Sequence, residues 1–254
     1  MYSLQIPTPF DERDQVDTAA PARGARRDGP RVRSSGFVVL GSNGEAVLMD
    51  DFEAGPRDRR GARRGAARPA RSSSAPGRES TQAAIRASRR APSMAPDAVL
   101  VRTPGFLQDA DDDRRVRAAL HGGCRRVAGA GAPVQLHRAD RREPAAGRGL
   151  TRSPTHPNIV GMKESGGDVA QIAGSRGGHA DDFSVLAGTT ATFYAALCVG
   201  AVGGILALAC AVPDACARLF RARRATAGTP RRWRCSASWC RSRGCSGQLT
   251  ACPG

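Results

Sequence analysis

The chain has 254 residues, with 39 lysines and arginines against 23 acidic residues, a formal net charge of +16 and a pI near 11.1. This length accommodates one large domain or two small ones, and no apolar run of about 18 residues is present that would span a membrane. The amino terminus lacks the basic and apolar segments of a secretory signal, and the eight cysteines therefore favour reduced thiols in a cytoplasmic protein.

The positive charge is distributed unevenly. Lys163 is the only lysine, and most of the arginines fall in four blocks, near 19–35, 55–76, 112–152 and 218–247, that show no period of 2 or 3.6 residues. Residues 153–217 carry two basic and five acidic residues, a net charge of −3. The blocks are either disordered basic linkers or frame-shifted translation of a GC-rich gene. With a suitable choice of synonymous codons, a one-base shift permits a helical pattern followed by SPVPVLLYN for residues 112–144. It likewise permits a helical pattern for residues 228–247, and both readings favour the frameshift.

Between these blocks, short apolar runs end in glycine, serine, threonine or proline. Continuous apolar runs alternating with helical stretches are typical of strands buried on both faces of a parallel α/β sheet. We therefore expect one domain over 1–217, with scrambled blocks near 19–35, 55–76 and 112–152, followed by a scrambled helical region over 218–254. The expected strands lie within the runs Leu4–Phe10, Gly36–Glu45, Asp97–Pro104, Asn158–Ser165, Phe183–Gly188 and Ala201–Leu208.

The strongest local signal is HPNIVGMKESGGD, residues 156–168, in which an apolar run delivers Lys163 at its end. A partly desolvated lysine at the end of a barrel strand loses its proton readily and can attack a carbonyl to form a Schiff base. The alternative is a surface lysine that merely ends a strand. The run before Lys163 is too apolar for an exposed edge, which favours the nucleophile.

This segment resembles the Schiff-base strand of the dihydrodipicolinate synthase/N-acetylneuraminate lyase family of pyruvate-dependent class I aldolases. Further segments resemble the same family in the same order, and together with the first they comprise 90 of the 254 residues. They are IPTPFDERDQVD, GFVVLGSNGEAVLM, GRESTQAAI, DAVLVRTPGF and FSVLAGTTATFYAALCVGAVGGILALACAVPD.

The resemblance implies a (β/α)8 TIM barrel whose catalytic groups lie at the carboxyl ends of the strands. Lys163 would form the imine with pyruvate or another 2-oxo acid, and Ser42 and Asn43 would bind the substrate carboxylate. Ile205 would contribute a backbone contact, although its sequence context equally fits plain barrel core. The resemblance also implies a homotetramer that needs no cofactor and no metal. Because the third and fifth strands would fall inside patternless blocks, we expect an incomplete barrel that folds poorly and is inactive.

Members of this family use a tyrosine on the fifth strand to relay protons. The chain reads Pro133-Val134-Gln135 at that place, whereas the shifted frame reads LLYN, so the tyrosine is missing from the chain as written. Tyr2 and Tyr194 lie in the wrong places to replace it. Within the family, the GSNGE and KESGGD motifs are more similar to those of 4-hydroxy-2-oxoglutarate aldolases than to those of 4-hydroxy-tetrahydrodipicolinate synthases. The expected activity is therefore that of the aldolase, and the synthase activity is the alternative.

Two other classes of protein are weighed against an aldolase. A nucleic-acid-binding protein would explain the charge, but the arginine blocks hold almost no aromatic stacking partners apart from Trp233 and Trp239. A metal site would need ligands at recognisable spacings, and the four C-terminal cysteines have none. His156 precedes a proline and is expected in a loop. We expect neither a nucleic acid nor a membrane as partner. The remaining cysteines, Cys198, Cys210 and Cys216, are expected to be small buried residues.

Overall fold

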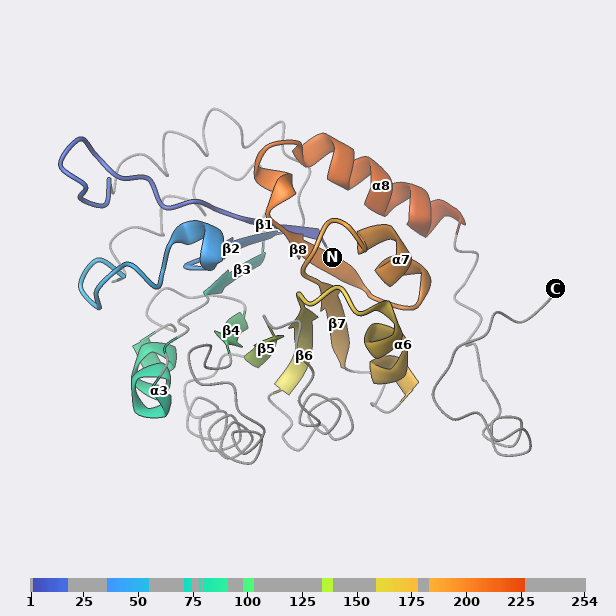
Figure 1. The fold of residues 1–254 in the computed structure, drawn as a ribbon, viewed down its shortest axis with the longest axis horizontal. Helices are drawn as coiled ribbons and strands as arrows, with labels where there is room; N and C mark the ends of the chain where they lie inside the picture. The colour runs from blue at the N-terminus through green and yellow to red at the C-terminus, as the bar shows by residue number, and fades with distance from the viewer. Residues whose placement is uncertain are drawn as a thin grey trace.

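A closed ring of eight parallel strands forms the centre of the computed structural model (Figure 1). The structure describes residues 2–17, 36–54, 71–74, 78, 80–90, 98–102, 134–138, 159–177 and 183–226. Each strand pairs with its neighbour in the sequence, and β8 pairs with β1 to close the ring. The strands are β1 Tyr2–Gln5, β2 Gly36–Val39, β3 Arg71–Ser74, β4 Ala98–Arg102, β5 Val134–Arg138, β6 Ile159–Glu164, β7 Ser184–Ala187 and β8 Gly203–Leu206.

The barrel class expected from the sequence is confirmed. Five of the six apolar runs contain a strand, and the run Leu4–Phe10 overlaps β1 only at Leu4 and Gln5. The expectation that the third and fifth strands would be missing from the ring is wrong. Strands β3 and β5 pair with neighbours on both sides even though they lie in patternless blocks. A parallel ladder is made of backbone N–H and C=O groups, which every residue except proline offers in full. Two flanking strands can therefore hold a segment whose side chains show no strand pattern.

Two sets of buried side chains show which face of each strand looks into the barrel. Val38, Leu100, Leu186 and Ile205 contact one another although they come from β2, β4, β7 and β8. Strands that are not neighbours can only touch across the interior, so these four residues fill the inside of the ring. The alternate residues face outward and pack against the helices. This outer core includes Leu4, Met162, Val185, Leu206, Ile172, Phe193, Ala196, Ala217 and Phe220.

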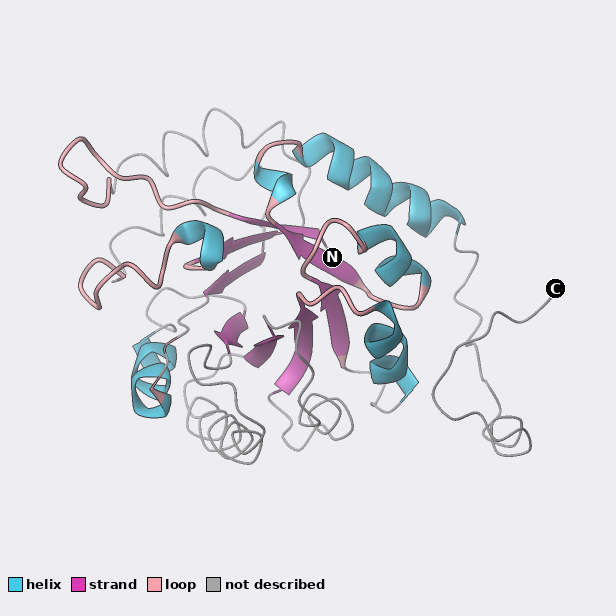
Figure 2. Ribbon diagram, viewed as in Figure 1, coloured by secondary structure: helices cyan, strands magenta, loops and turns pink. Residues whose placement is uncertain are grey.

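The described helices lie outside the ring of strands (Figure 2). Helix α3 spans Thr81–Arg90, α6 Val169–Gly177, α7 Phe193–Cys198 and α8 Pro213–Thr226, and short 3-10 turns η1 (Ser42–Gly44) and η4 (Leu208–Cys210) follow β2 and β8. Asp168 begins α6 by accepting the backbone N–H of Gln171 at 2.9 Å, as an N-cap does. Within the described ranges, no helix has both the length and the apolar character to cross a membrane.

Two boundaries expected from the sequence, the domain boundary at residue 217 and the end of the first strand, differ from those in the structure. Helix α8 runs to Thr226 and so crosses the boundary expected at residue 217; residues 227–254, the rest of the predicted scrambled region, lie outside the described residues. Strand β1 ends at Gln5, well before the end of the predicted run. Pro7 and Pro9 follow, and proline has no N–H to continue a ladder. Block 19–35 and most of 55–76 and 112–152 also lie outside the described residues.

Candidate active site

Lys163 is buried inside the barrel near the carboxyl end of β6. It is the last residue but one of the strand and is 3% exposed. Its register partner on β7 is Leu186, a member of the interior cluster, and partners in a parallel ladder share a face of the sheet. Lys163 is thus removed from water on the same face of the sheet as the apolar interior cluster. Burial lowers the pKa of Lys163 from 10.5 to about 8, because desolvation disfavours the charged form.

This pKa changes how much of the lysine is nucleophilic. With a pKa of about 8, about a tenth of Lys163 is neutral at pH 7. That is roughly 300-fold more free amine than a lysine with the ordinary pKa of 10.5 would supply. A neutral amine has the lone pair that attacks a carbonyl carbon, so a lysine in this environment can act as a nucleophile.

Glu164 holds the backbone around Lys163 in place. Its side chain is 1% exposed, and its carboxylate accepts the N–H groups of Gly166 at 2.6 Å and Gly167 at 3.0 Å. Its backbone oxygen accepts the N–H of Gly188, at the end of β7, at 2.5 Å. A Cβ at Gly188 would lie 2.7 Å from that same oxygen, so only glycine allows this approach of the two strands. The segment that carries Lys163 is therefore fixed on both sides.

The loop after β2 places Ser42 and Asn43 at the same end of the barrel, because all eight strands run in parallel. Leu40 begins the loop with a left-handed backbone at φ 55°, a conformation that costs a non-glycine residue about 1 kcal/mol and is common at functional sites. Thr8 donates its hydroxyl proton to the backbone oxygen of Gly44 at 2.6 Å, which joins this loop to the one after β1. Ser42 is exposed and Asn43 half-buried, so both can meet a ligand.

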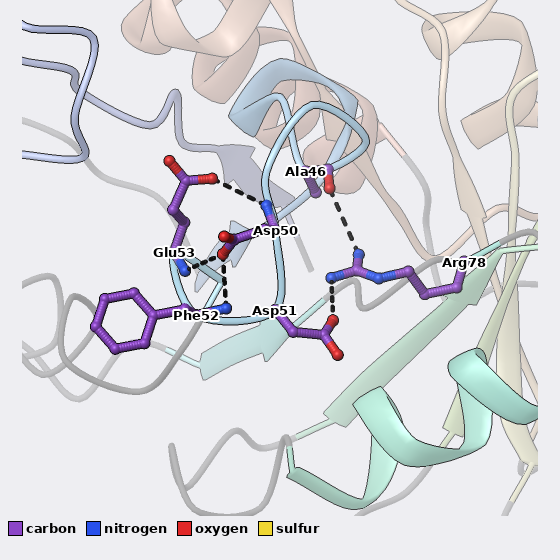
Figure 3. Close-up of polar contacts among 6 residues, drawn as sticks. All are labelled: Ala46, Asp50, Asp51, Phe52, Glu53 and Arg78. Carbon is purple, nitrogen blue, oxygen red and sulfur yellow. Dashed lines mark hydrogen bonds and ion pairs between the residues drawn. The ribbon is translucent and has the colours of Figure 1, made fainter.

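The chain beyond this loop is held by a second set of contacts (Figure 3). The Asp50 carboxylate accepts the backbone N–H of Glu53 at 2.7 Å, and the Glu53 carboxylate accepts that of Asp50 at 2.9 Å. Arg78, which lies just before α3, donates to the backbone oxygen of Ala46 at 3.4 Å and to the Asp51 carboxylate at 3.0 Å. These contacts tie the end of the β2 loop to the segment before α3.

The structure places Ile205 inside the barrel and Tyr194 outside the ring of strands. Ile205 is 1% exposed in the interior cluster, which confirms it as barrel core, and its backbone contact to a substrate stays a prediction. Residues 134–138 of β5 contain no tyrosine. Tyr194 is 53% exposed on α7, outside the ring, and Tyr2 lies on β1.

Sequence reasoning missed Gln5 and misplaced two cysteines. Gln5 is 2% exposed, and its side-chain Nε2 donates to Ser42 Oγ at 3.2 Å. Cys216 is buried as expected, but Cys198 and Cys210 are exposed, because they lie at the end of α7 and in the turn η4. The Cys210 thiol donates to the backbone oxygen of Gln5 at 2.7 Å. Partial burial raises the pKa of Cys210, while hydrogen bonds with Asn43 and Gln5 oppose that rise.

No group of three or more histidine, cysteine or acidic side chains lies close enough to hold a metal ion in the parts of the chain that the structure describes. The histidine before the proline, and the tryptophans and C-terminal cysteines considered for nucleic-acid or metal binding, lie outside those parts. They are His156, Trp233, Trp239, Cys235, Cys240, Cys245 and Cys252.

The ring of eight parallel strands, with a desolvated lysine near the carboxyl end of β6, defines a (β/α)8 barrel with its candidate site at the end where such barrels carry their active sites. The sequence model of the dihydrodipicolinate synthetase family matches residues 149–230, the segment that contains Lys163. This match confirms, over residues 149–230, the resemblance seen in the sequence.

Several solved structures share the fold over most of this chain. The dihydrodipicolinate synthase of Aquifex aeolicus superposes with a TM-score of 0.78 at 21% identity, over 89% of this chain and 75% of that one. A dihydrodipicolinate synthase of Bacillus anthracis gives 0.74 at 21% identity, over 89% and 76%. A prophage protein of the same family from E. coli K12, solved in complex with pyruvate, gives 0.73 at 22% identity, over 89% and 76%.

Proposed function

We propose that this chain carries a pyruvate-dependent class I aldolase site in which Lys163 forms the imine. The observation that carries the proposal is the burial of the chain's only lysine inside the barrel, where its pKa falls to about 8. The lysine lies in the segment that matches the family, and the similar E. coli protein was solved with pyruvate. A homotetramer in the cytoplasm is part of the same proposal.

The proposed reaction uses Lys163 as nucleophile and Ser42 and Asn43 as carboxylate ligands. The neutral amine attacks C2 of a 2-oxo acid, and loss of water from the carbinolamine leaves a protonated imine. When 4-hydroxy-2-oxoglutarate is bound, the C3–C4 bond breaks, the C4 hydroxyl loses its proton and glyoxylate departs. The C3–C4 electron pair flows into the imine to give an enamine. Protonation of the enamine at C3 and hydrolysis of the imine then release pyruvate and restore the amine.

The choice of 4-hydroxy-2-oxoglutarate rests on two motifs, GSNGE around Ser42 and KESGGD around Lys163. The second candidate is 4-hydroxy-tetrahydrodipicolinate synthase, and the names of the Aquifex and Bacillus neighbours favour it. The sequence argues against that candidate. In this chain the loop after β2 reads Gly41-Ser42-Asn43, whereas those synthases have paired threonines there. Gly105 follows Pro104, at a position where those synthases have an aromatic residue.

The missing tyrosine sets an expectation for the rate. A positioned general acid–base contributes about 10²- to 10⁴-fold to a proton transfer. We expect imine formation to persist and the carbon–carbon step to be slower by a factor in that range than in a relative that has the tyrosine.

The test measures pyruvate release from 4-hydroxy-2-oxoglutarate and, separately, pyruvate consumption with the aldehyde partner of the synthase reaction. Turnover of the first substrate that disappears in Lys163→Met supports the aldolase, and turnover of the second alone supports the synthase. Absence of Lys163-dependent turnover with both contradicts the proposal and favours the inactive, frame-shifted product. Binding of DNA or RNA without turnover would instead support the basic nucleic-acid-binding alternative.

A further inference from the structure

We infer that Gln5 is a positioning residue that turns the Ser42 hydroxyl into a donor for the substrate carboxylate, and that the site thereby selects 2-oxo acids with a free carboxylate. The inference rests on the proposed function, which assigns the carboxylate to the loop that contains Ser42. Gln5 lies on β1, and its side chain takes no part in the proposed reaction.

Gln5 lies inside the barrel at the carboxyl end of β1. Its register partner on β2 is Val38, which belongs to the interior cluster, so the two side chains share the inner face. The carboxamide is 2% exposed. Two further buried polar side chains face the interior with it, Ser3 from the same strand and Lys163 from β6. A buried carboxamide is costly unless its polar atoms are paired, so its partner is informative.

The direction of the hydrogen bond decides what Ser42 can do. An amide nitrogen donates and cannot accept, so Ser42 Oγ is the acceptor in the 3.2 Å contact with Gln5 Nε2. A serine hydroxyl has a single proton. With its oxygen engaged by Gln5, that proton is available to another acceptor, and an ionised carboxylate can only accept. A neutral ester also accepts this proton, but the hydrogen bond to an ionised carboxylate is about twice as strong, and an ammonium group can only donate. The pair therefore favours an anion next to Ser42 over a neutral ester or an ammonium group.

Neighbouring residues leave space for the Gln5 side chain and fix its backbone. A Cβ at Gly41 would overlap the Gln5 carboxamide and lie 2.8 Å from its Cγ, so glycine at position 41 leaves the space that Gln5 occupies. The backbone oxygen of Gln5 accepts the Cys210 thiol at 2.7 Å, and Cys210 in turn has a side-chain hydrogen bond with Asn43. Gln5 thus connects the loop after β2 with the turn after β8 and holds both carboxylate ligands, Ser42 directly and Asn43 through Cys210.

The experiment measures the pyruvate concentration that gives half-maximal trapping of Lys163 by borohydride, and repeats the measurement with methyl pyruvate. Gln5→Met keeps the length of the side chain and removes the donor, and we expect it to raise the half-saturating pyruvate concentration about three- to tenfold. Gln5→Glu should raise it further, because a carboxylate would take the Ser42 proton for itself. Either substitution should change the half-saturating concentration of methyl pyruvate much less.

A double-mutant cycle separates positioning from a general structural effect. Gln5→Met should have no additional effect in a Ser42→Ala background, because the hydroxyl that it positions is already gone. Gln82→Met, at an exposed position of α3, is the matched control and should leave all values unchanged. Additive effects of the two substitutions, or wild-type pyruvate affinity in Gln5→Glu, would overturn the inference.

Two outcomes keep this inference distinct from the proposed function. In the first outcome, borohydride traps pyruvate on Lys163 of the wild-type chain, but the Gln5 variants prefer pyruvate over methyl pyruvate as strongly as wild type does. Only the inference about Gln5 then fails, and the proposed function stands. If the wild-type chain is not trapped, both fail. Should Gln5→Met not fold, Ser42→Ala alone decides, because the inference requires it to reduce the preference for pyruvate over its methyl ester.

Discussion

Replacement of Lys163 by methionine should stabilise the fold at neutral pH. Burial lowers the pKa of Lys163 from 10.5 to about 8 in the folded chain. Below pH 8 the lysine is protonated in both states, and the folded state bears the full cost of burying the charge. Between about pH 8 and 10.5 the unfolded chain keeps the proton and the folded chain does not, so the free energy of unfolding rises with pH. Above this window both states are neutral and the cost is gone.

The size of the effect follows from the two pKa values. A drop from 10.5 to about 8 corresponds to about 3 kcal/mol in the free energy of unfolding. Methionine has a similar length and no charge, so it avoids the cost of burying the ammonium group. The difference in free energy of unfolding, Lys163→Met minus wild type, should therefore be about 3 kcal/mol larger at pH 7 than at pH 10.5. Urea unfolding of both chains at several pH values measures the difference, in which the titration of all other groups cancels.

The matched control is Arg86→Met at an exposed position on α3, which should change stability by the same small amount at every pH. A difference between Lys163→Met and wild type that stays constant from pH 7 to 10.5 would refute the reasoning, because it would mean that Lys163 titrates alike in the folded and unfolded chains.

Three further predictions concern the same region. The rate of pyruvate trapping at Lys163 should rise with pH and reach half its maximum near pH 8, and a midpoint near 10.5 would contradict the burial argument. Glu164→Ala leaves two backbone N–H groups without their carboxylate and should cost about 3 kcal/mol in urea unfolding, whereas Glu12→Ala in an exposed turn should cost almost nothing. Gly188→Ala should cost about 2 kcal/mol or more, because its Cβ would meet backbone. Gly174→Ala, at an exposed position of α6 where a Cβ would meet nothing within 4 Å, should stabilise by about 0.5–1 kcal/mol. Equal thermal stabilities of these two variants would contradict the account.

The sequence predicts those strands whose side chains are buried on both faces. The run IVGM, residues 159–162, is continuously apolar because both faces of β6 are buried. Met162 packs against the outer core, and Lys163 faces the interior. Strand β3 could not be predicted in this way. Its residues, RSSS, include no apolar side chain, and its conformation is set by hydrogen bonds to β2 and β4 on either side.

The candidate site was predicted only where its residues lie in one continuous motif. Lys163 and Ser42 follow apolar runs and could be found from them. The Gln5–Ser42 contact joins residues 37 positions apart, and the Cys210–Gln5 contact joins residues 205 positions apart. Such contacts depend on closure of the barrel, which no local pattern encodes. The alternation of Ser3 and Gln5 about Leu4 was the one available sign that polar side chains enter the barrel.

The measurement that tests the central claim most directly is borohydride reduction of the whole chain in the presence of pyruvate, followed by mass spectrometry of its peptides. Lys163 is the only lysine, so the amino group of Met1 serves as an internal reference for an ordinary amine. The account predicts a pyruvate-derived secondary amine on the Lys163 peptide, in excess over the amino terminus, and none without pyruvate. An unmodified Lys163 peptide beside a modified amino terminus would contradict it.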